Sequence, residues 1–344
     1  MSQRFARSAA TLLLLAAIPG CSGFQSDVPQ ASFSRASGSS GALAGRAPVI
    51  VEFSNGLKRG NLPYALTLGP DGAMWICEST PTDSGPARLV RIAQDGTVLG
   101  SFAYGQGSFP QLSSIAAGPD GALWFTDYDD GIIGRMTTTG KLRTFNVPGV
   151  NGYPAAITAG PDGALWFTVP DQSTIDRIDT AGKITSFAKG ITGDPDGITQ
   201  GPDGALWFTE PSASKIGRMT TAGAATEFPS GASPTSIAAG PDGALWFTEY
   251  KSIGRITVSG NVTQYRQGLK STQLPQAIVA GADGAMWFTD QRQAELGRIS
   301  MSGTISQYSK GITPRSEPSA IAAGANGTIW FTELAQNRVA RATL

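Results

Sequence analysis

The sequence predicts an all-β protein, a seven-bladed β-propeller, from its composition and from the spacing of its tryptophans. Charged residues make up 15% of the 344 residues, against about 25% in an average globular protein. Gly (44) and Pro (22) are abundant, which favours short strands and tight turns over long charged helices. The seven Trp recur at intervals of 39 to 49 residues: Trp75, Trp124, Trp166, Trp207, Trp246, Trp287 and Trp330.

Each Trp lies in a copy of one ten-residue motif, which reads GPDGALWFTE at residues 201–210. Repeats of about 40 to 50 residues with four short strands each are typical of propeller blades, whereas solenoid repeats of similar length are helical. The seven Trp therefore count seven blades.

Each repeat is expected to contain four strands. A strand of small residues comes first, as in residues 236–239, because space next to the axis is limited. Pro-Asp-Gly then forms a tight turn, since Pro presets φ and Gly accepts a positive φ. The ALWFT strand is apolar on both faces, as expected between neighbouring blades. The third strand carries Ile-Gly-Arg, and the fourth ends in an aromatic residue: Phe102, Phe145, Phe187, Phe228, Tyr265 or Tyr308.

The two ends of the chain together predict how the ring closes. The last repeat stops at Leu344, after its third strand, while residues 48–53 (PVIVEF) match the fourth-strand pattern, aromatic residue included. Pairing this N-terminal strand with the three C-terminal strands removes exposed sheet edges. The predicted propeller therefore spans residues 48–344.

The N-terminal segment has the layout of a secretory signal, with Arg4 and Arg7 before a short apolar run and small residues. The run is short for a bilayer span. Because Ile18-Pro19-Gly20-Cys21 resembles the lipobox of bacterial lipoproteins, residues 1–20 are predicted to be a lipoprotein-type signal peptide and Cys21 the lipidation site. An ordinary cleaved signal is the alternative. Residues 21–47, rich in Ser, Gly and Ala, are predicted to be a disordered tether. We expect an extracytoplasmic protein, either a membrane-anchored lipoprotein or a secreted or periplasmic one, with the lipid anchor as its only membrane contact.

Charge and the absence of histidine exclude several functions. Lys plus Arg and Asp plus Glu number 26 each, so no overall positive field attracts nucleic acid, and nucleic acid is not an expected partner. The chain has no His. This excludes Ser-His-Asp and Cys-His catalysis and any histidine-ligated metal site.

The repeated elements GPDGALWFTE, IGRMTTAG and TEFP of residues 201–229 resemble those of the virginiamycin B lyase (streptogramin lyase) family of seven-bladed propellers. The resemblance covers about residues 48–344. It implies an enzyme that opens the ester-closed ring of streptogramin B antibiotics by elimination, with a divalent metal such as Mg²⁺. It also implies two histidines directly after a Pro in late blades and a Glu just past the last Trp-Phe motif.

The residues at the implied catalytic positions differ from that pattern. The matching elements are Pro275-Gln276-Ala277-Ile278 and Pro318-Ser319-Ala320-Ile321, so Gln276 and Ser319 stand where the histidines are implied. Glu333, or Leu334 with one residue of offset, stands where the Glu is implied. A neutral amide is not a base at pH 7, and a Ser needs its own activator. Mg²⁺ is expected as a cofactor only if the family chemistry is retained.

The residue after the blade-entry Pro differs from one repeat to the next and is expected to face the axial opening. Because repeated positions serve the scaffold, this divergent position is where function is expected. The predicted ligand-binding residues are Tyr64, Thr235, Gln276 and Ser319, and the same position holds Ala155, Asp196 and, in the irregular second repeat, Ser113. Asp196 and Glu333 are the candidate catalytic bases, and the metal ligands are left open.

A second set of carboxylates ends the Trp strands in every repeat except the third, which has Val169. These are Glu78, Asp127, Glu210, Glu249, Asp290 and Glu333. A Ca²⁺ or Mg²⁺ site is one interpretation. We favour ion pairs with the Arg that recurs on the next strand at Arg91, Arg135, Arg177, Arg218, Arg255, Arg298 and Arg341. The Pro-Asp-Gly carboxylates are interpreted as turn residues that bond their own backbone.

Three functions remain open at this point. The first is a binding module that holds a small molecule, a glycan or a protein partner on its axial face. The second is a metal-dependent carbon-oxygen lyase that opens the virginiamycin B ring, or a related hydrolase, with Asp196 and Glu333 in place of the histidines. The third is a structural envelope protein. We expect a monomer.

Overall fold

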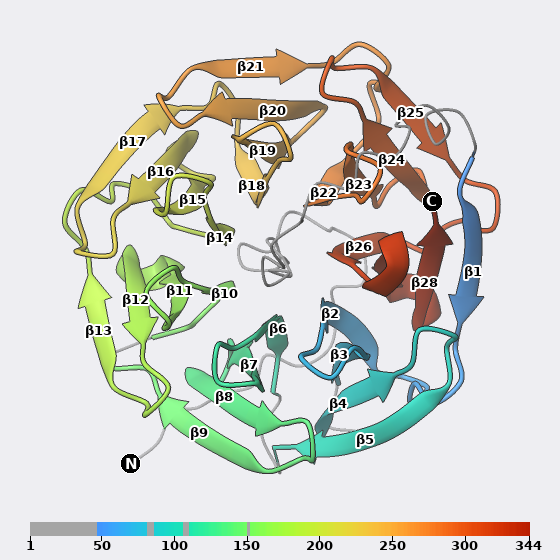
Figure 1. Ribbon diagram of the computed structural model, residues 1–344, viewed down its shortest axis with the longest axis horizontal. Coiled ribbons are helices and arrows are strands. Elements are labelled where there is room, and N and C mark those ends of the chain that lie inside the picture. Colours follow the sequence, from blue (N-terminus) through green and yellow to red (C-terminus); the bar gives the residue numbers. More distant parts are fainter. Residues whose placement is uncertain (1–46, 81–85, 106–109, 150–151) are drawn as a thin grey trace, which may run out of the picture.

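The computed structural model describes residues 47–80, 86–105, 110–149 and 152–344. The predicted signal peptide, Cys21 and nearly all of the predicted tether lie outside these residues. Within them, the protein has 28 strands in seven four-stranded sheets. The sheets stand as blades around a central axis (Figure 1), which confirms the predicted seven-bladed propeller.

Each blade is an antiparallel meander whose strands follow one another from the axis to the rim (Figure 1). The innermost strands of blades 1 to 7 are β2 (Leu62–Leu68), β6 (Leu112–Ala117), β10 (Ile157–Ala159), β14 (Ile198–Gln200), β18 (Pro234–Ala239), β22 (Pro275–Ala280) and β26 (Pro318–Ala323). The second strands, which carry the Trp, are β3 (Met74–Ser79), β7 (Ala122–Asp127), β11 (Leu165–Val169), β15 (Leu206–Glu210), β19 (Ala244–Glu249), β23 (Met286–Asp290) and β27 (Thr328–Glu333).

The two outer strands of each blade complete the sheet. The third strands are β4 (Ala87–Ile92), β8 (Ile132–Thr137), β12 (Thr174–Ile178), β16 (Lys215–Met219), β20 (Ser252–Thr257), β24 (Glu295–Ile299) and β28 (Arg338–Thr343). The rim strands are β5 (Val98–Tyr104), β9 (Leu142–Asn146), β13 (Ile184–Phe187), β17 (Ala225–Pro229), β21 (Val262–Tyr265), β25 (Ile305–Tyr308) and, in blade 7, β1 (Val49–Phe53). Three short 3-10 turns are also described: η1 (Pro170–Gln172), η2 (Ala325–Gly327) and η3 (Leu334–Gln336).

Closure occurs in blade 7, where β1 pairs with β28 in antiparallel register from Val49↔Thr343 to Phe53↔Val339. Phe53 stacks on Trp330 with ring centroids 5.4 Å apart. In each of the other six blades, the Trp stacks in the same way on the aromatic residue of the rim strand, with ring centroids 5.3–5.8 Å apart. The N-terminal strand therefore supplies both the pairing and the aromatic contact that the last repeat lacks.

The core lies between the blades, where the Trp face of one blade packs against the Phe face of the next. Trp207 of blade 4, for example, belongs to one buried cluster with Leu245 and Phe247 of blade 5. The Gly of the Ile-Gly-Arg element makes room for this packing: a Cβ on Gly217 would lie 2.0–2.6 Å from the Phe208 ring. That Gly is therefore required by close approach and not by a turn.

A three-residue contact unit recurs at the end of each blade where the Asp-Gly turns lie. In blade 4, Asp203 accepts hydrogen bonds from the Trp207 indole (3.0 Å) and from the backbone of Ala205 (3.3 Å), and it pairs with Arg218 at 2.6 Å. The other five units pair Asp71 with Arg91, Asp120 with Arg135, Asp162 with Arg177, Asp242 with Arg255 and Asp283 with Arg298, at 2.6–2.7 Å.

The turn carboxylates thus bond their own backbone, as predicted, but they also take the recurring arginines. Our expectation that those arginines pair with the carboxylates ending the Trp strands is wrong. The registers explain this: Trp207 lies directly opposite Arg218, on the face away from Glu210, and successive side chains of a strand point to opposite faces.

In blade 7, the Trp and the Arg bond a residue of blade 1 in place of a turn Asp. Asn326 replaces the turn Asp and adopts a positive φ of 56°. The Trp330 indole instead donates to the Gln94 side chain at 3.2 Å, and Arg341 donates to the Gln94 carbonyl. Gln94 also donates to the Gly72 carbonyl of its own blade at 3.0 Å. It therefore joins blade 1 to blade 7, and we call this contact between the first and last blades the closure seam.

Two further observations concern cysteine and the membrane. Cys77 is free and buried on β3, and burial raises the pKa of its thiol above the usual value. In the described parts of the chain, no helix has the length and hydrophobicity that crossing a bilayer requires.

Candidate functional site at the axial ring

The divergent residues predicted to bind a ligand lie at irregularities of the innermost strands. The register of the innermost strand shifts between Pro63 and Ala65 in blade 1, and equivalent shifts occur in blades 2, 5, 6 and 7. Such bulges redirect a side chain out of the regular alternation. They include Tyr64, Ser113, Thr235, Gln276 and Ser319.

In five blades, a threonine of the preceding blade bonds the backbone carbonyl at this divergent position. Thr248 donates its hydroxyl to the Gln276 carbonyl at 2.8 Å, and Thr168 does the same to Asp196 at 2.8 Å. Further bonds join Thr126 to Ala155, Thr209 to Thr235 and Thr289 to Ser319, at 2.5–2.8 Å. We call the set of Tyr64, Ser113, Ala155, Asp196, Thr235, Gln276 and Ser319 the axial ring.

These threonines were missed by sequence reasoning, which treated the Trp-Phe-Thr repeat only as core. Their regular recurrence at the third position of that repeat was the available signal. Blade 1 has Cys77 at this position. The repeated Thr thus positions the ring backbone, while the ring side chains remain free to vary.

The ring is not uniform around the axis. On blades 2 and 3, the Ser113 hydroxyl bonds the Thr126 hydroxyl (2.9 Å) and the Ala155 carbonyl (3.1 Å), and Ala155 offers only a methyl group. On the other arc, Tyr64, Thr235 and Gln276 are half-buried. Asp196 and Ser319 are each 5% exposed. Polar groups that could meet a ligand therefore concentrate on blades 4 to 7 and blade 1.

Three of the six carboxylates that end the Trp strands hold loops that lead into the ring. Glu210 accepts the Gly193 N–H at 2.8 Å, and Asp290 accepts the Leu274 N–H at 3.3 Å. Glu78 accepts the Lys58 N–H at 3.0 Å and also pairs with Arg88. The role of these three carboxylates is thus structural, and their partners are entry-loop amides and, for Glu78, an Arg of its own blade.

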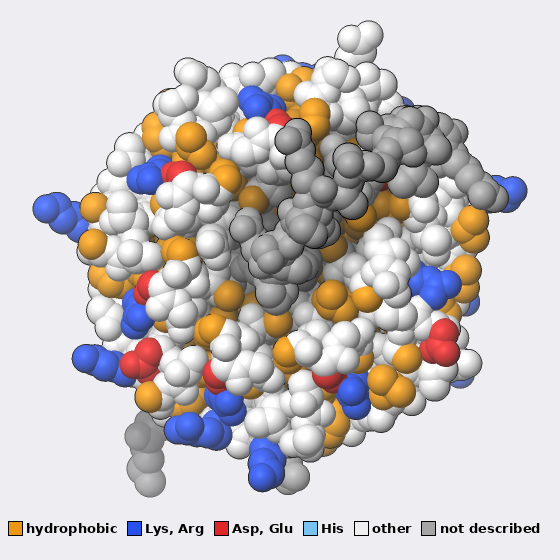
Figure 2. All heavy atoms as spheres, in the orientation of Figure 1, with side chains coloured by type: hydrophobic (Ala, Val, Ile, Leu, Met, Phe, Trp, Pro, Cys, Tyr) orange, Lys and Arg blue, Asp and Glu red, His pale blue; other side chains and the backbone are white. Residues whose placement is uncertain are grey.

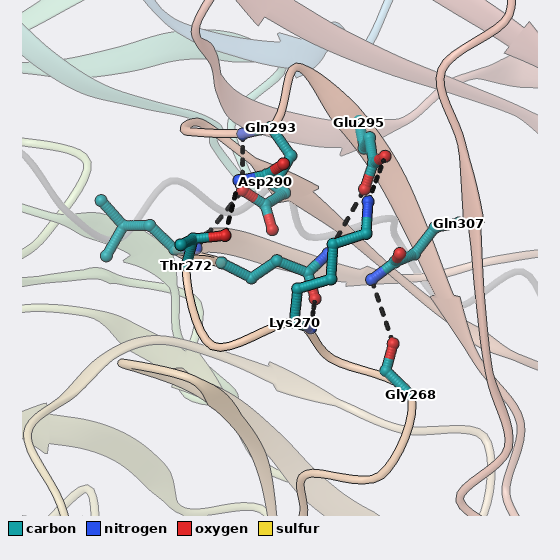
Figure 3. A network of polar contacts seen from close by, with 9 residues as sticks. Gly268, Lys270, Thr272, Asp290, Gln293, Glu295 and Gln307 are labelled. Atoms are coloured by element: carbon teal, nitrogen blue, oxygen red, sulfur yellow. Dashed lines mark hydrogen bonds and ion pairs between the residues drawn. The ribbon is translucent and has the colours of Figure 1, made fainter.

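Blade 6 shows one such entry loop in detail (Figure 3). Asp290 accepts the Gln293 N–H at 3.1 Å, and the Gln293 side chain donates to Thr272 at 3.0 Å. Lys270 pairs with Glu295 at 3.2 Å. The loop that delivers Gln276 to the ring is therefore tied down at both the Trp strand and the third strand.

Blades 4 and 7 share a different arrangement, in which a rim carboxylate joins the entry loop to a cation. In blade 4, Glu227 accepts from Thr192 N–H (2.7 Å) and pairs with Lys215 (2.5 Å). In blade 7, Glu52 accepts from Thr313 and pairs with Arg338 at 2.6 Å. These two entry loops carry Asp196 and Ser319.

Each arrangement lies beside the carboxylate that ends the Trp strand of its blade, Glu210 in blade 4 and Glu333 in blade 7. Burial raises the pKa of both. It raises the pKa of Glu210 to about 7, with repulsion from Glu227 adding to the effect. It likewise raises the pKa of Glu333 to about 7, with Glu52 as the neighbouring like charge. Neither Glu333 carboxylate oxygen has a hydrogen bond of normal geometry among the described residues. Both carboxyls are therefore protonated more readily than an exposed glutamate.

The described residues contain no preformed cluster of metal-ligating side chains. Mg²⁺ prefers several oxygen ligands in octahedral geometry, commonly including carboxylates. In the described part of the chain, no three Asp, Glu or Cys side chains gather to hold a metal ion. The two candidate bases come from different blades, Asp196 from blade 4 and Glu333 from blade 7. No reaction step through Mg²⁺ follows from this arrangement.

Fold and site together define a closed seven-bladed propeller whose divergent polar residues gather at one end of its axis. The model of the virginiamycin B lyase family matches residues 51–229 and 188–344. The chain therefore belongs to the virginiamycin B lyase family.

Solved structures of lyases share the fold over nearly their whole length. A streptogramin B lyase structure is 29% identical, with a TM-score of 0.77, covering 86% of this chain and 98% of that one. A catalytically inactive histidine-to-alanine variant of virginiamycin B lyase from Staphylococcus aureus, with quinupristin, is 32% identical, with a TM-score of 0.77, covering 87% of this chain and 100% of that one. A search of curated proteins found no match.

A more distant match shows the fold alone. The extracellular domain of a putative hybrid two-component system from B. thetaiotaomicron is 16% identical, with a TM-score of 0.68, covering 86% of this chain and 42% of that one.

Proposed function

We propose that this chain is a binding member of the virginiamycin B lyase family that holds a ligand at the axial ring without catalysing the lyase reaction. The observation that carries the proposal is the absence of His from the chain, set beside a relative that a single histidine-to-alanine change leaves catalytically inactive. Gln276 and Ser319 stand at the positions where the family resemblance implies histidines. Neither residue type takes a proton at pH 7 without an activator.

The character of the ring supports binding over a purely structural role. Five ring residues lie at bulges, and Tyr64, Thr235 and Gln276 keep partly exposed polar side chains. A scaffold alone gives no reason for six different residue types at one position in seven blades. The proposed ligand is a peptide-like ring of the streptogramin B type, because the 32% identical relative was solved with quinupristin.

The proposed location is outside the cytoplasm. The signal-like residues 1–20 and the lipobox-like Cys21 support it. Figure 2 shows charged side chains scattered over the outer part of one face, with no continuous patch of a single sign. We therefore propose a small-molecule, glycan or protein partner, because the visible part of this face offers no charged patch of one sign to attract a membrane surface or nucleic acid.

Isothermal titration calorimetry with quinupristin tests the binding proposal. The wild-type chain is expected to bind, and Gln276→Ala is expected to weaken binding about tenfold, as removal of one good polar contact does. Gln307→Ala, on the rim strand β25, is the matched control and should leave affinity unchanged. No heat of binding with either protein would favour the structural envelope role instead.

A catalytic alternative is supported by one specific observation, the pKa of about 7 at Glu333. A general base works best when its pKa lies near the working pH. In this alternative, Glu333 removes a proton and the ring ester breaks by elimination. Turnover of quinupristin, with and without Mg²⁺, that disappears in Glu333→Gln but persists in Glu295→Gln would establish it.

A further inference from the structure

We propose that the ligand of the axial ring carries a positively charged amine and that Asp196 receives this charge. The inference rests on the proposed binding function of the ring. Asp196 follows the entry Pro of blade 4, and its backbone is held from two sides. Its N–H donates to the Thr209 carbonyl at 2.9 Å, and its carbonyl accepts from the Thr168 hydroxyl at 2.8 Å.

The Asp196 carboxyl has no partner that explains its position. The residue is 5% exposed, and Oδ1 has no hydrogen bond to any described residue. Glu78, in contrast, is buried but pairs with Arg88. An unpaired buried carboxylate is costly, and such a group keeps its charge only when something pairs with it.

The charge around Asp196 selects a cation. The charged neighbour that acts on Asp196 is Asp194, another carboxylate on the same entry loop. Burial and this repulsion raise the pKa of Asp196 well above its usual value. No described Lys or Arg forms an ion pair with either residue. A ligand ammonium would supply the missing charge, whereas an anion would be repelled.

The backbone next to Asp196 lies where blades 4 and 5 approach each other. A Cβ on Gly197 would lie 2.6 Å from the Thr235 carbonyl oxygen. The absence of a side chain at Gly197 therefore lets blades 4 and 5 approach closely beside Asp196. The Thr235 carbonyl already accepts the Thr209 hydroxyl at 2.8 Å, so the backbone next to Asp196 is fixed where these two blades meet.

The test compares two synthetic rings with the full-length protein by titration calorimetry. One is a cyclic peptide of the streptogramin B type bearing one primary amine, and the other is the same ring with that amine acetylated. The wild-type chain should bind the amine ring at least about tenfold more tightly than the acetylated ring. Asp196→Asn should remove this preference without weakening the acetylated ring, and Asp194→Asn should retain most of it.

Each outcome separates this inference from the binding proposal. Equal affinity for the two rings, or an unchanged preference in Asp196→Asn, contradicts the assignment of the amine but leaves the binding function intact. If neither ring binds, the proposed function fails. Saturation-transfer NMR then tests the cation site separately, by measuring whether hexylammonium binds to the protein. Binding of hexylammonium that Asp196→Asn abolishes supports the cation site, and its absence overturns the inference as well. Thermal melting checks that Asp196→Asn is folded.

Discussion

At one end of the blades, six Asp-Gly turns repeat the same contacts, with indole-to-carboxylate distances of 3.0–3.1 Å and Asp–Arg distances of 2.6–2.7 Å. At the other end, the axial ring has a different residue in nearly every blade. Backbone geometry is constrained at both ends, by the turns at one and by the threonine bonds at the other. From this difference we infer that the repeated contacts stabilise the propeller. The side chains of the axial ring are not needed for that stability and can bind a ligand.

Trp207→Ala tests the repeated end most severely. The indole packs against blade 5, stacks on Phe228 at 5.8 Å and bonds Asp203. Its loss should lower the free energy of unfolding by about 3–5 kcal/mol. Denaturant unfolding followed by Trp fluorescence and circular dichroism would measure it. A loss below about 1 kcal/mol would show that the blades do not depend on these contacts.

Opposite responses to pH should distinguish the buried Glu333 from the turn carboxylate Asp203. The pKa of Glu333 is raised from 4.5 to about 7, so the stability it contributes is full below about pH 4.5 and is lost as pH rises through about 7. Glu333→Gln should therefore stabilise the protein above pH 7, by up to about 3 kcal/mol. Thermal melting from pH 4 to 9 would measure the effect.

Asp203 should behave in the opposite sense. Burial alone would raise its pKa, but hydrogen bonds from Trp207 and Arg218 outweigh burial and hold the pKa below 3.8. Its contribution is present above that value and is lost on acidification. Parallel pH profiles for Glu333→Gln and Asp203→Asn would contradict the distinction between the two ends.

Replacement of two aspartates by Ala compares the two ends directly. Asp203→Ala leaves an indole N–H and an Arg without partners and should cost about 2 kcal/mol. Asp196→Ala removes a buried carboxyl whose Oδ1 has no partner, and the equivalent residue of blade 3 is already Ala155, so no loss of stability is expected. Urea midpoints at pH 7 would check both. Equal losses would mean that Asp196 has a stabilising contact in the free protein.

Gln94→Ala should destabilise the protein less than Asp203→Ala does and should act at the closure seam. Loss of the bond to the Trp330 indole (3.2 Å) should cost about 1 kcal/mol. Amide hydrogen exchange should speed up first in β1 and β28, because the seam opens there. Uniform acceleration in all blades would show that closure is not a separate weak point.

Much of the fold followed from sequence because its determinants are local and repeated. The Trp positions counted the blades, and the aromatic residue Phe53 identified the strand that completes blade 7. The Arg partners could not be assigned, because pairing depends on strand register and not on recurrence alone. The seam contact of Gln94 was equally hidden, since it joins residues more than 200 positions apart.

The sequence indicated where the candidate site lies but not how its residues are held. Divergence after the entry Pro pointed to the ring, yet the bulges, the Thr bonds and the burial of Asp196 are long-range features. Asp176 shows the same limit. It replaces the Gly of the third strand opposite Phe167 and is buried, with a bond to Ser186 at 2.8 Å. Nothing in its local sequence indicates that environment.

Equilibrium dialysis against quinupristin, followed by chromatography and mass analysis of the recovered ligand, tests the central claim most directly. Elimination gives an open-chain isomer of the same mass that elutes separately, and hydrolysis adds one water. We predict uptake of one ligand per chain, reduced in Gln276→Ala, with the recovered ring unchanged. A ring-opened product formed by the wild-type chain would contradict the claim that this propeller binds without catalysis.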